Sequence, residues 1–199
     1  MLYPVLPNFL PPLAGPHFSE VSRVAVNSKG RIFDCRGEAT IANLRLSPDM
    51  RELYDAFIGA WRVSEVFEVG GANKRATRQG TACFRIGPGA SLIEEYQSRG
   101  SAGELRFLAL VWWDESAHVY RLLTCANNDG CQLRGTAKWE GQALVNAWEE
   151  KVDGKTVTFK DSFVNILPSS FRLVSEGRAD GKTIWLVKTK YERRKELDQ

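Results

Sequence analysis

The chain has few histidines and no long apolar run, and both shortages limit what it can do. Only two histidines, His17 and His118, occur among its 199 residues, which argues against a Ser-His-Asp triad and a histidine-rich metal site. No apolar stretch approaches the roughly 20 residues of a membrane-spanning helix. The nucleophile-elbow, zinc-protease and Walker motifs are also missing. We therefore expect no metal and no membrane partner.

Positive charge is present but is not concentrated. The sequence carries 27 Lys and Arg against 24 Asp and Glu, a formal net charge of +3. Nucleic-acid binding usually needs a basic stripe. The only candidate for such a stripe is the C-terminal "KTKYERRK". There Lys188 and Lys190 alternate with uncharged residues, as on the solvent-exposed face of a strand. We expect no nucleic-acid partner.

The N-terminus does not resemble a signal peptide, because it lacks a basic region and prolines interrupt every apolar run. A cytoplasmic protein with reduced thiols is therefore the default expectation. Cys125 and Cys131 flank a turn in "TCANNDGCQ". They are interpreted mainly as small residues at the ends of a hairpin, and whether they pair stays open.

The first 46 residues are expected to form an appendage on the domain that spans 47–199. Within them, 21–37 is predicted to form two strands around a turn. A short helix is predicted over 47–58, because Ser47 is a good N-cap and Pro48 a good first helical residue. Its apolar residues recur at helical spacing and form one stripe: Met50, Leu53, Tyr54 and Phe57.

From Ala60 to Arg194 the apolar pattern has a period of two. Ten strand-like segments alternate with short connections that hold Gly, Asn or Asp, as tight turns require. Such connections leave no room for crossover helices, so the sheet must be antiparallel and sequential. We predict an all-β fold, an up-and-down barrel of about ten strands with one short N-terminal helix. The segment "LRFLALVWWD" is apolar on both faces, so we expect the helix or the N-terminal appendage to cover its outer face.

One end of such a barrel must be plugged. Trp61, at the start of the first strand, is suited to this role, and Gly59 allows a close approach beside it. Arg193 falls on the inward face of the last strand, adjacent to the first strand at closure, where it can stack over the indole.

With "IGAW" near the start and "TKYERR" near the end, the sequence resembles the calycin superfamily, in particular lipocalin-like bacterial domains of uncharacterised function. The resemblance covers about residues 47–194 and implies a small-molecule cavity inside a barrel. It does not identify the molecule. Haem-binding relatives would need a histidine on a late strand, and this sequence has none there. We expect no cofactor.

The alternation predicts which residues face inward on four strands, with Glu65, Asp161, Ser175 and Trp185 among them, and it also selects candidate site residues. Glu65 and Asp161 are carboxylates between inward-facing apolar neighbours, a setting that raises a carboxyl pKa and suits a general acid or base. The alternative is a structural ion pair with an arginine such as Arg121 or Arg134. The predicted ligand-binding residues combine aromatic walls with these two arginines: Phe67, Trp113, Trp148, Phe159, Phe163, Arg121 and Arg134.

Three functions stay open at this point. The first is binding of a small apolar or aromatic molecule, with an arginine meeting a carboxylate or carbonyl group of that molecule. The second is a cofactor-free isomerase, cyclase or lyase that uses Asp161 or Glu65. The third is a barrel filled by side chains that serves as a structural or partner-binding module. Both a monomer and a homodimer fit the sequence.

Overall fold

The computed structural model of the protein describes residues 46–69, 75–127, 130–152 and 154–194. The predictions for the appendage, including its two strands and its bracing role, lie outside these residues. In the described part, α1 (Pro48–Phe57) precedes ten strands. The strands and one short 3-10 helix are β1 (Gly59–Val69), β2 (Arg75–Ile86), η2 (Pro88–Ala90), β3 (Leu92–Gly100), β4 (Gly103–Asp114), β5 (Val119–Ala126), β6 (Gly130–Glu140), β7 (Ala143–Val152), β8 (Lys155–Leu167), β9 (Ser170–Ala179) and β10 (Lys182–Arg193).

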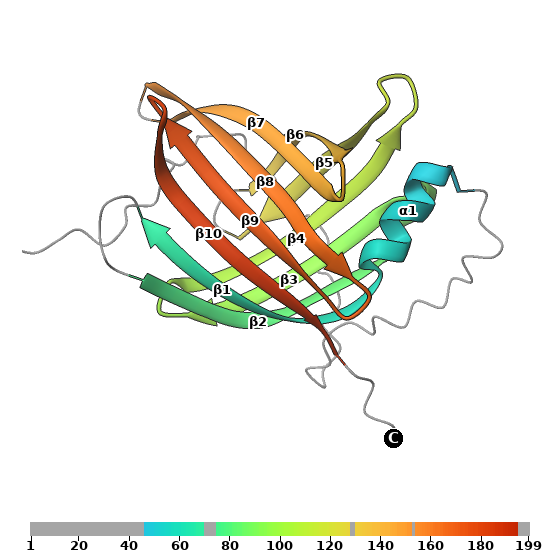
Figure 1. Ribbon diagram of the computed structural model, residues 1–199, viewed down its shortest axis with the longest axis horizontal. Coiled ribbons are helices and arrows are strands. Elements are labelled where there is room, and N and C mark those ends of the chain that lie inside the picture. Colours follow the sequence, from blue (N-terminus) through green and yellow to red (C-terminus); the bar gives the residue numbers. More distant parts are fainter. Residues whose placement is uncertain (1–45, 70–74, 128–129, 153, 195–199) are drawn as a thin grey trace, which may run out of the picture. The chain divides into compact units, whose positions relative to one another are not determined.

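The ten strands form one closed antiparallel barrel. Each strand pairs with its neighbours in the sequence, and β10 pairs with β1 to close the sheet (Figure 1). Closure leaves no unpaired sheet edge. The predicted up-and-down barrel is confirmed.

The helix α1 begins and ends close to where the sequence predicts. The Ser47 side chain accepts a hydrogen bond from the Met50 amide at 3.2 Å, which caps the first turn. The predicted apolar stripe is the buried face of the helix: Met50, Leu53, Tyr54 and Phe57.

This stripe packs into one end of the barrel rather than onto its outside. The helix lies across that end (Figure 1), and its buried residues join a core of inward-facing strand residues. Two hydrogen bonds fix it there: the Tyr54 hydroxyl donates to the Ser91 carbonyl at 3.2 Å, and the Tyr120 hydroxyl donates to the Asp49 carbonyl at 2.9 Å. The expectation that the helix covers the outer face of β4 is therefore wrong. We call this end the capped end and the opposite one the distal end.

Trp61 and Arg193 meet at the capped end as predicted. Trp61 is fully buried, and the Arg193 guanidinium lies 4.3 Å from the centre of its ring. Arg193 also donates to the carbonyls of Pro168 and Ile58, at 2.5 and 2.8 Å. Gly59 has φ +132°, and a Cβ at that position would collide with the Arg193 side chain. The glycine therefore makes room for the arginine, not for the helix.

The strand registers confirm the predicted inward faces of β1, β8, β9 and β10. Trp61, opposite Arg193, and Glu65, opposite Thr189, lie on the inward face of β1. Asp161 lies opposite Ser175 on the inward faces of β8 and β9. The interior of the barrel can therefore be listed residue by residue from the pairing alone.

The hairpin of β5 and β6 carries a disulfide between Cys125 and Cys131. The two residues are direct cross-strand partners with a Cα–Cα distance of 3.9 Å. The expectation of reduced thiols does not hold for this pair, because the register brings the sulfur atoms together. Within the described residues, no helix is long and apolar enough to cross a membrane.

Candidate functional site

Inward-facing residues are buried to different degrees at the two ends of the barrel. At the capped end, Trp61, Phe171 and Tyr191 have almost no accessible surface. At the distal end, the inward-facing residues keep accessible surface: Phe67, Arg78, Phe107, Gln132, Arg134, Trp148, Glu150, Phe159 and Trp185. These inward-facing side chains at the distal end are therefore less completely buried than Trp61, Phe171 and Tyr191 at the capped end.

Aromatic side chains from three strands form a row across this end. The register aligns Trp148, Phe159, Gly177 and Trp185 on β7, β8, β9 and β10. Trp148 stacks on Phe159 with ring centres 5.2 Å apart, and Phe159 meets Trp185 edge to face at 6.0 Å. A Cβ on Gly177 would come within 3.1 Å of the Phe159 ring, so the glycine lets that ring lie against the sheet. We call these four residues the aromatic row.

An ion pair lies beside the aromatic row. The Arg134 guanidinium is 5.5 Å from the centre of the Trp148 ring and pairs with the Glu150 carboxylate. The Trp148 indole also donates to Glu150 at 2.8 Å. Arg134, predicted from the sequence as a ligand-binding residue, thus lies in the distal interior and already contacts a carboxylate.

Polar side chains occupy the next row toward the capped end. The same registers align Asn146, Asp161 and Ser175 on β7, β8 and β9, and we call them the polar row. Each lies two residues along its strand from a member of the aromatic row, a step of about 7 Å. Asn146 is 1% exposed, and neither its amide nitrogen nor its amide oxygen has a hydrogen-bond partner. Buried polar groups without partners are rare in proteins, so this amide needs an explanation.

Two carboxyl groups in this region have raised pKa values. Burial raises the pKa of Asp161 to about 6, although a hydrogen bond from Ser175 and the charge of Arg134 oppose the rise. Burial raises the pKa of Glu94, on β3, to about 8. The hydroxyl of Tyr191 donates to Glu94 at 3.2 Å and opposes this rise, while the charge of Asp161 adds to it. Glu94 and Asp161 therefore interact across the interior.

Glu65, predicted as a catalytic candidate, is held by three neighbours. Arg78 forms an ion pair with its carboxylate, and the hydroxyl of Tyr96 donates to it. The Ser98 hydroxyl donates to it at 3.4 Å. Arg78 also lies 4.2 Å from the centre of the Phe67 ring, another predicted site residue. These contacts match the structural alternative for Glu65, with Arg78 as the partner in place of the arginines that we expected.

The remaining predicted site residues are divided between the two ends and the outer face. Phe163 packs against Phe57, and Trp113 against Tyr120, both in the core of the capped end. Arg121 lies on the outer face, because its neighbour Tyr120 takes the inward position, and it pairs with Asp114 at 3.0 Å. The structure therefore places Arg121 outside the interior.

Several residues of this region were missed by the sequence reasoning. They are Arg78, Glu94, Asn146 and Trp185. The alternation held a signal for three of them. Trp185 lies on the predicted inward face of the last strand, and Asn146 shares a face with Trp148, which we had selected. Glu94 similarly shares a face with Tyr96, two residues further along β3. The partnership of Arg78 with Glu65 depends on the register of β1 and β2 and has no signal in either segment.

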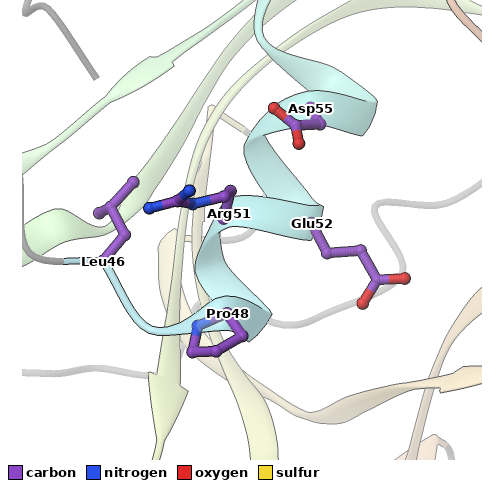
Figure 2. A pocket seen from close by; sticks show the side chains of 5 residues that line it. All are labelled: Leu46, Pro48, Arg51, Glu52 and Asp55. Atoms are coloured by element: carbon purple, nitrogen blue, oxygen red, sulfur yellow. The ribbon is translucent and has the colours of Figure 1, made fainter. Parts of the chain in front are cut away.

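Two surface hollows lie near α1 and are less suited to binding. One of about 580 Å³ borders the start of the helix; Figure 2 shows its lining residues Leu46, Pro48, Arg51, Glu52 and Asp55. Another of about 790 Å³ lies between the helix and the turn from β8 to β9, with Glu52, Trp139 and Leu167 in its lining. The helix side chains that line the first hollow are mostly exposed and charged. Among the residues that the structure describes, no group of three metal-ligating side chains occurs.

No protein-family model matches the chain, and no curated protein matches it. It is similar in structure to the S-type phycobiliprotein lyase CPES from Guillardia theta, with a TM-score of 0.46, 11% identity, and coverage of 76% of this chain and 94% of that one. It is also similar to mFAP0, a redesigned β-barrel bound to DFHBI, with a TM-score of 0.39, 14% identity, and coverage of 68% and 97%. At these values no residue role passes from those proteins to this chain. A closed ten-strand barrel fits a calycin-like fold.

Proposed function

We propose that the barrel binds a small aromatic or apolar molecule in its distal interior, as a lipocalin-like carrier. The observation that carries this proposal is the Asn146 side chain, which is buried, inward-facing and without a partner. An amide in this state costs free energy unless something else hydrogen-bonds to it. A ligand in the interior supplies that partner.

The two rows match the parts of such a ligand. Trp148, Phe159 and Trp185 offer apolar ring surface that is half-buried and therefore open to a further ring. The polar row offers an amide, a carboxyl group and a hydroxyl one step deeper. Apolar walls with a few converging polar groups are typical of small-molecule sites. A flat molecule with one polar group fits both rows at once.

The test uses a panel of aromatic probes of three sizes, with benzyl, naphthyl and anthracenyl rings, each as the methanol, the methylamine and the carboxylic acid. Isothermal titration calorimetry measures their affinity for the full chain. We expect saturable binding of at least one ring size. Trp148→Ala should weaken that binding by about tenfold, since an aromatic contact contributes about 1 kcal/mol beyond the buried area.

Trp112→Ala is the matched control, because Trp112 pairs with Arg121 on the outer face of the barrel. It should leave the affinity of the probe unchanged. Equal losses in Trp112→Ala and Trp148→Ala would contradict the proposed site. Absence of saturable binding across the whole panel would contradict the proposed function and favour a barrel filled by its own side chains.

A second candidate function is proton transfer on the bound molecule. It is favoured by Asp161, whose pKa is raised to about 6, close to the pH at which a general acid or base is most useful. In a carrier, the molecule recovered from the protein is chemically unchanged. In an isomerase, cyclase or lyase, the wild type converts it and Asp161→Asn does not. Mass spectrometry of the recovered molecule separates the two.

A further inference from the structure

Among the described residues, the charged groups that face the interior of the barrel do not balance. Apart from Arg193 at the capped end, the inward-facing residues include two guanidinium groups, Arg78 and Arg134. They also include four carboxyl groups: Glu65, Glu94, Glu150 and Asp161. Each arginine pairs with a carboxylate, Arg78 with Glu65 and Arg134 with Glu150. The carboxyl groups in excess are Glu94 and Asp161.

Neither of these two carboxyl groups forms a salt bridge with any residue that the structure describes. The partner of Glu94 is the Tyr191 hydroxyl, and that of Asp161 is the Ser175 hydroxyl. Glu94 is only 7% exposed. A buried carboxylate without a cation is costly, so such groups are usually paired, neutralised or bound to a ligand.

A second observation comes from the neighbouring strand. Asn146 is the direct cross-strand partner of Asp161 on the inward face, and its amide has no hydrogen-bond partner. Its oxygen is therefore available to accept a hydrogen bond from a donor that lies against the Asp161 carboxylate. A carboxylate and a free amide oxygen side by side form an acceptor site, which suits an N–H donor with positive charge.

We propose that the ligand is an organic cation, an aromatic or apolar amine whose protonated nitrogen binds Asp161 and Asn146, with Glu94 supplying the second negative charge from the opposite wall. This inference rests on the proposed function and names the chemical class of its ligand. It differs from the expectation of a ligand whose carboxylate or carbonyl group meets an arginine, because Arg134 already contacts Glu150 and Arg121 lies on the outer face.

The geometry places the two parts of such a cation in different rows. Its ring lies on the aromatic row, and its nitrogen lies about 7 Å deeper in the polar row. A ring with an ammonium group on a short linker has about this length. The aromatic faces at Trp148 and Trp185 also attract positive charge.

Binding of the cation has a consequence for protons. Burial holds the pKa of Glu94 at about 8 in the free protein, so the group is protonated near neutral pH. An ammonium group beside it favours the ionised form, and the proton leaves Glu94 for the solvent as the cation binds. The charged and titratable groups that surround the pair are Glu65, Arg78, Tyr96, Arg134 and Tyr191. Burial raises the pKa of Tyr96 and Tyr191, so neither loses a proton in this range.

The experiment compares the three head groups on each ring of the probe panel by calorimetry. For the ring size that binds, we expect the methylamine to bind at least about tenfold more tightly than the methanol and the carboxylic acid. Asp161→Asn and Glu94→Gln should each weaken binding of the amine by about tenfold and leave the methanol within about twofold. Glu95→Gln is the matched control, because Glu95 lies on the outer face and pairs with Arg85.

Proton release gives a readout that does not depend on affinity. Titrations of the amine near pH 7 in buffers of different ionisation enthalpy should show release of about one proton per ligand, since the pKa of Glu94 is about 8. As the pH rises from about 7 toward about 9 the release should fall, because Glu94 is increasingly ionised in the free protein. Glu94→Gln should abolish the release near pH 7.

The outcomes distinguish a failure of this inference from a failure of the proposed function on which it rests. If the methanol binds as tightly as the amine and Asp161→Asn changes neither, the ligand is not a cation, while aromatic binding stands. If the carboxylic acid binds most tightly, the inference is overturned and an arginine site replaces it. If no member of the panel binds, both the inference and the proposed function fail.

Discussion

Both ends of the barrel hold an arginine over a tryptophan ring, yet within the described residues only one end is closed by a helix. At the capped end, Arg193 covers Trp61 at 4.3 Å, and Phe57 of α1 packs against Phe171 behind it. At the distal end, Arg134 lies 5.5 Å from the ring of Trp148 and pairs with Glu150. The same residue types therefore serve two purposes, and what differs is whether α1 covers them.

The difference extends to the polar groups. At the capped end, polar atoms have partners within the protein: Trp61 donates to the Phe57 carbonyl at 2.8 Å, and Tyr120 to the Asp49 carbonyl at 2.9 Å. In the polar row, Asn146 has none. A buried polar group stabilises the folded state when its hydrogen bonds are made within the protein. A polar group that binds a ligand must keep a hydrogen-bonding position available for it. Under the proposed function, the capped end therefore serves stability and the distal interior serves binding.

The largest expected effect is on the pH dependence of stability, and it comes from Glu94 between the two ends. Its pKa is raised from the ordinary value of 4.5 to about 8, so the folded state keeps a proton that the unfolded state has released. The free energy of unfolding should be highest below pH 4.5 and fall as the pH rises to about 8, by up to about 5 kcal/mol. Urea unfolding across this range measures the fall.

Glu94→Gln mimics the protonated carboxyl group and should remove most of this slope, so that the variant is more stable than the wild type near pH 8. Asp161, with its pKa raised to about 6, accounts for the part of the slope that remains at lower pH. Glu95→Gln should keep the wild-type slope. An unchanged slope in Glu94→Gln would show that the Glu94 carboxyl group is not buried as described.

The next effect separates the two tryptophans directly. Trp61→Ala removes a fully buried ring that meets Phe171 at 4.8 Å, and it should lower the free energy of unfolding by about 3–5 kcal/mol. Trp148→Ala removes a half-buried ring and should cost about 1–2 kcal/mol. Urea unfolding of both variants at one pH measures the difference, and equal losses would contradict the division of roles.

The smallest effect concerns the arginine at the capped end. Arg193→Met keeps an unbranched apolar stem but removes the guanidinium group, its contact with the indole and its hydrogen bonds to Pro168 and Ile58. Because Arg193 is partly exposed, the loss should be about 1 kcal/mol. Ligand affinity at the distal end should not change. A change in probe affinity without a change in stability would place the binding site at the capped end instead.

Alternation and caps were enough to predict most of the architecture. Ser47 and Pro48 marked the start of α1, and the period-two pattern gave the inward faces of four strands. The contact between Trp61 and Arg193 followed from closure of a meander, in which the first and last strands must pair. The cap and the alternation depend on residues that are close in the sequence. The contact between Trp61 and Arg193 depends only on the pairing of the first strand with the last.

Which side chains contact each other in the site depends on the registers of the paired strands, and these registers cannot be read from the sequence. Glu65 was selected as a buried carboxylate, but its partner Arg78 became evident only from the pairing of β1 with β2. Arg121 was expected to face the interior. Side chains alternate along β5, so a difference of one position places a residue on the outer face instead. Helix α1 was one of two candidates for covering the outer face of β4, beside the N-terminal appendage. Its apolar stripe shows that the helix packs against something, but not against which surface.

The most direct test of the central claim is native mass spectrometry of the full chain, as purified and after addition of the tightest probe of the panel, with Trp148→Ala beside the wild type. The account predicts one small molecule per chain in the wild type, either retained from the cell or taken up from the added probe. It also predicts a reduced occupancy in Trp148→Ala. A wild-type chain that stays empty under both conditions, or a Trp148→Ala chain that is occupied to the same extent, would contradict a binding site in the distal interior.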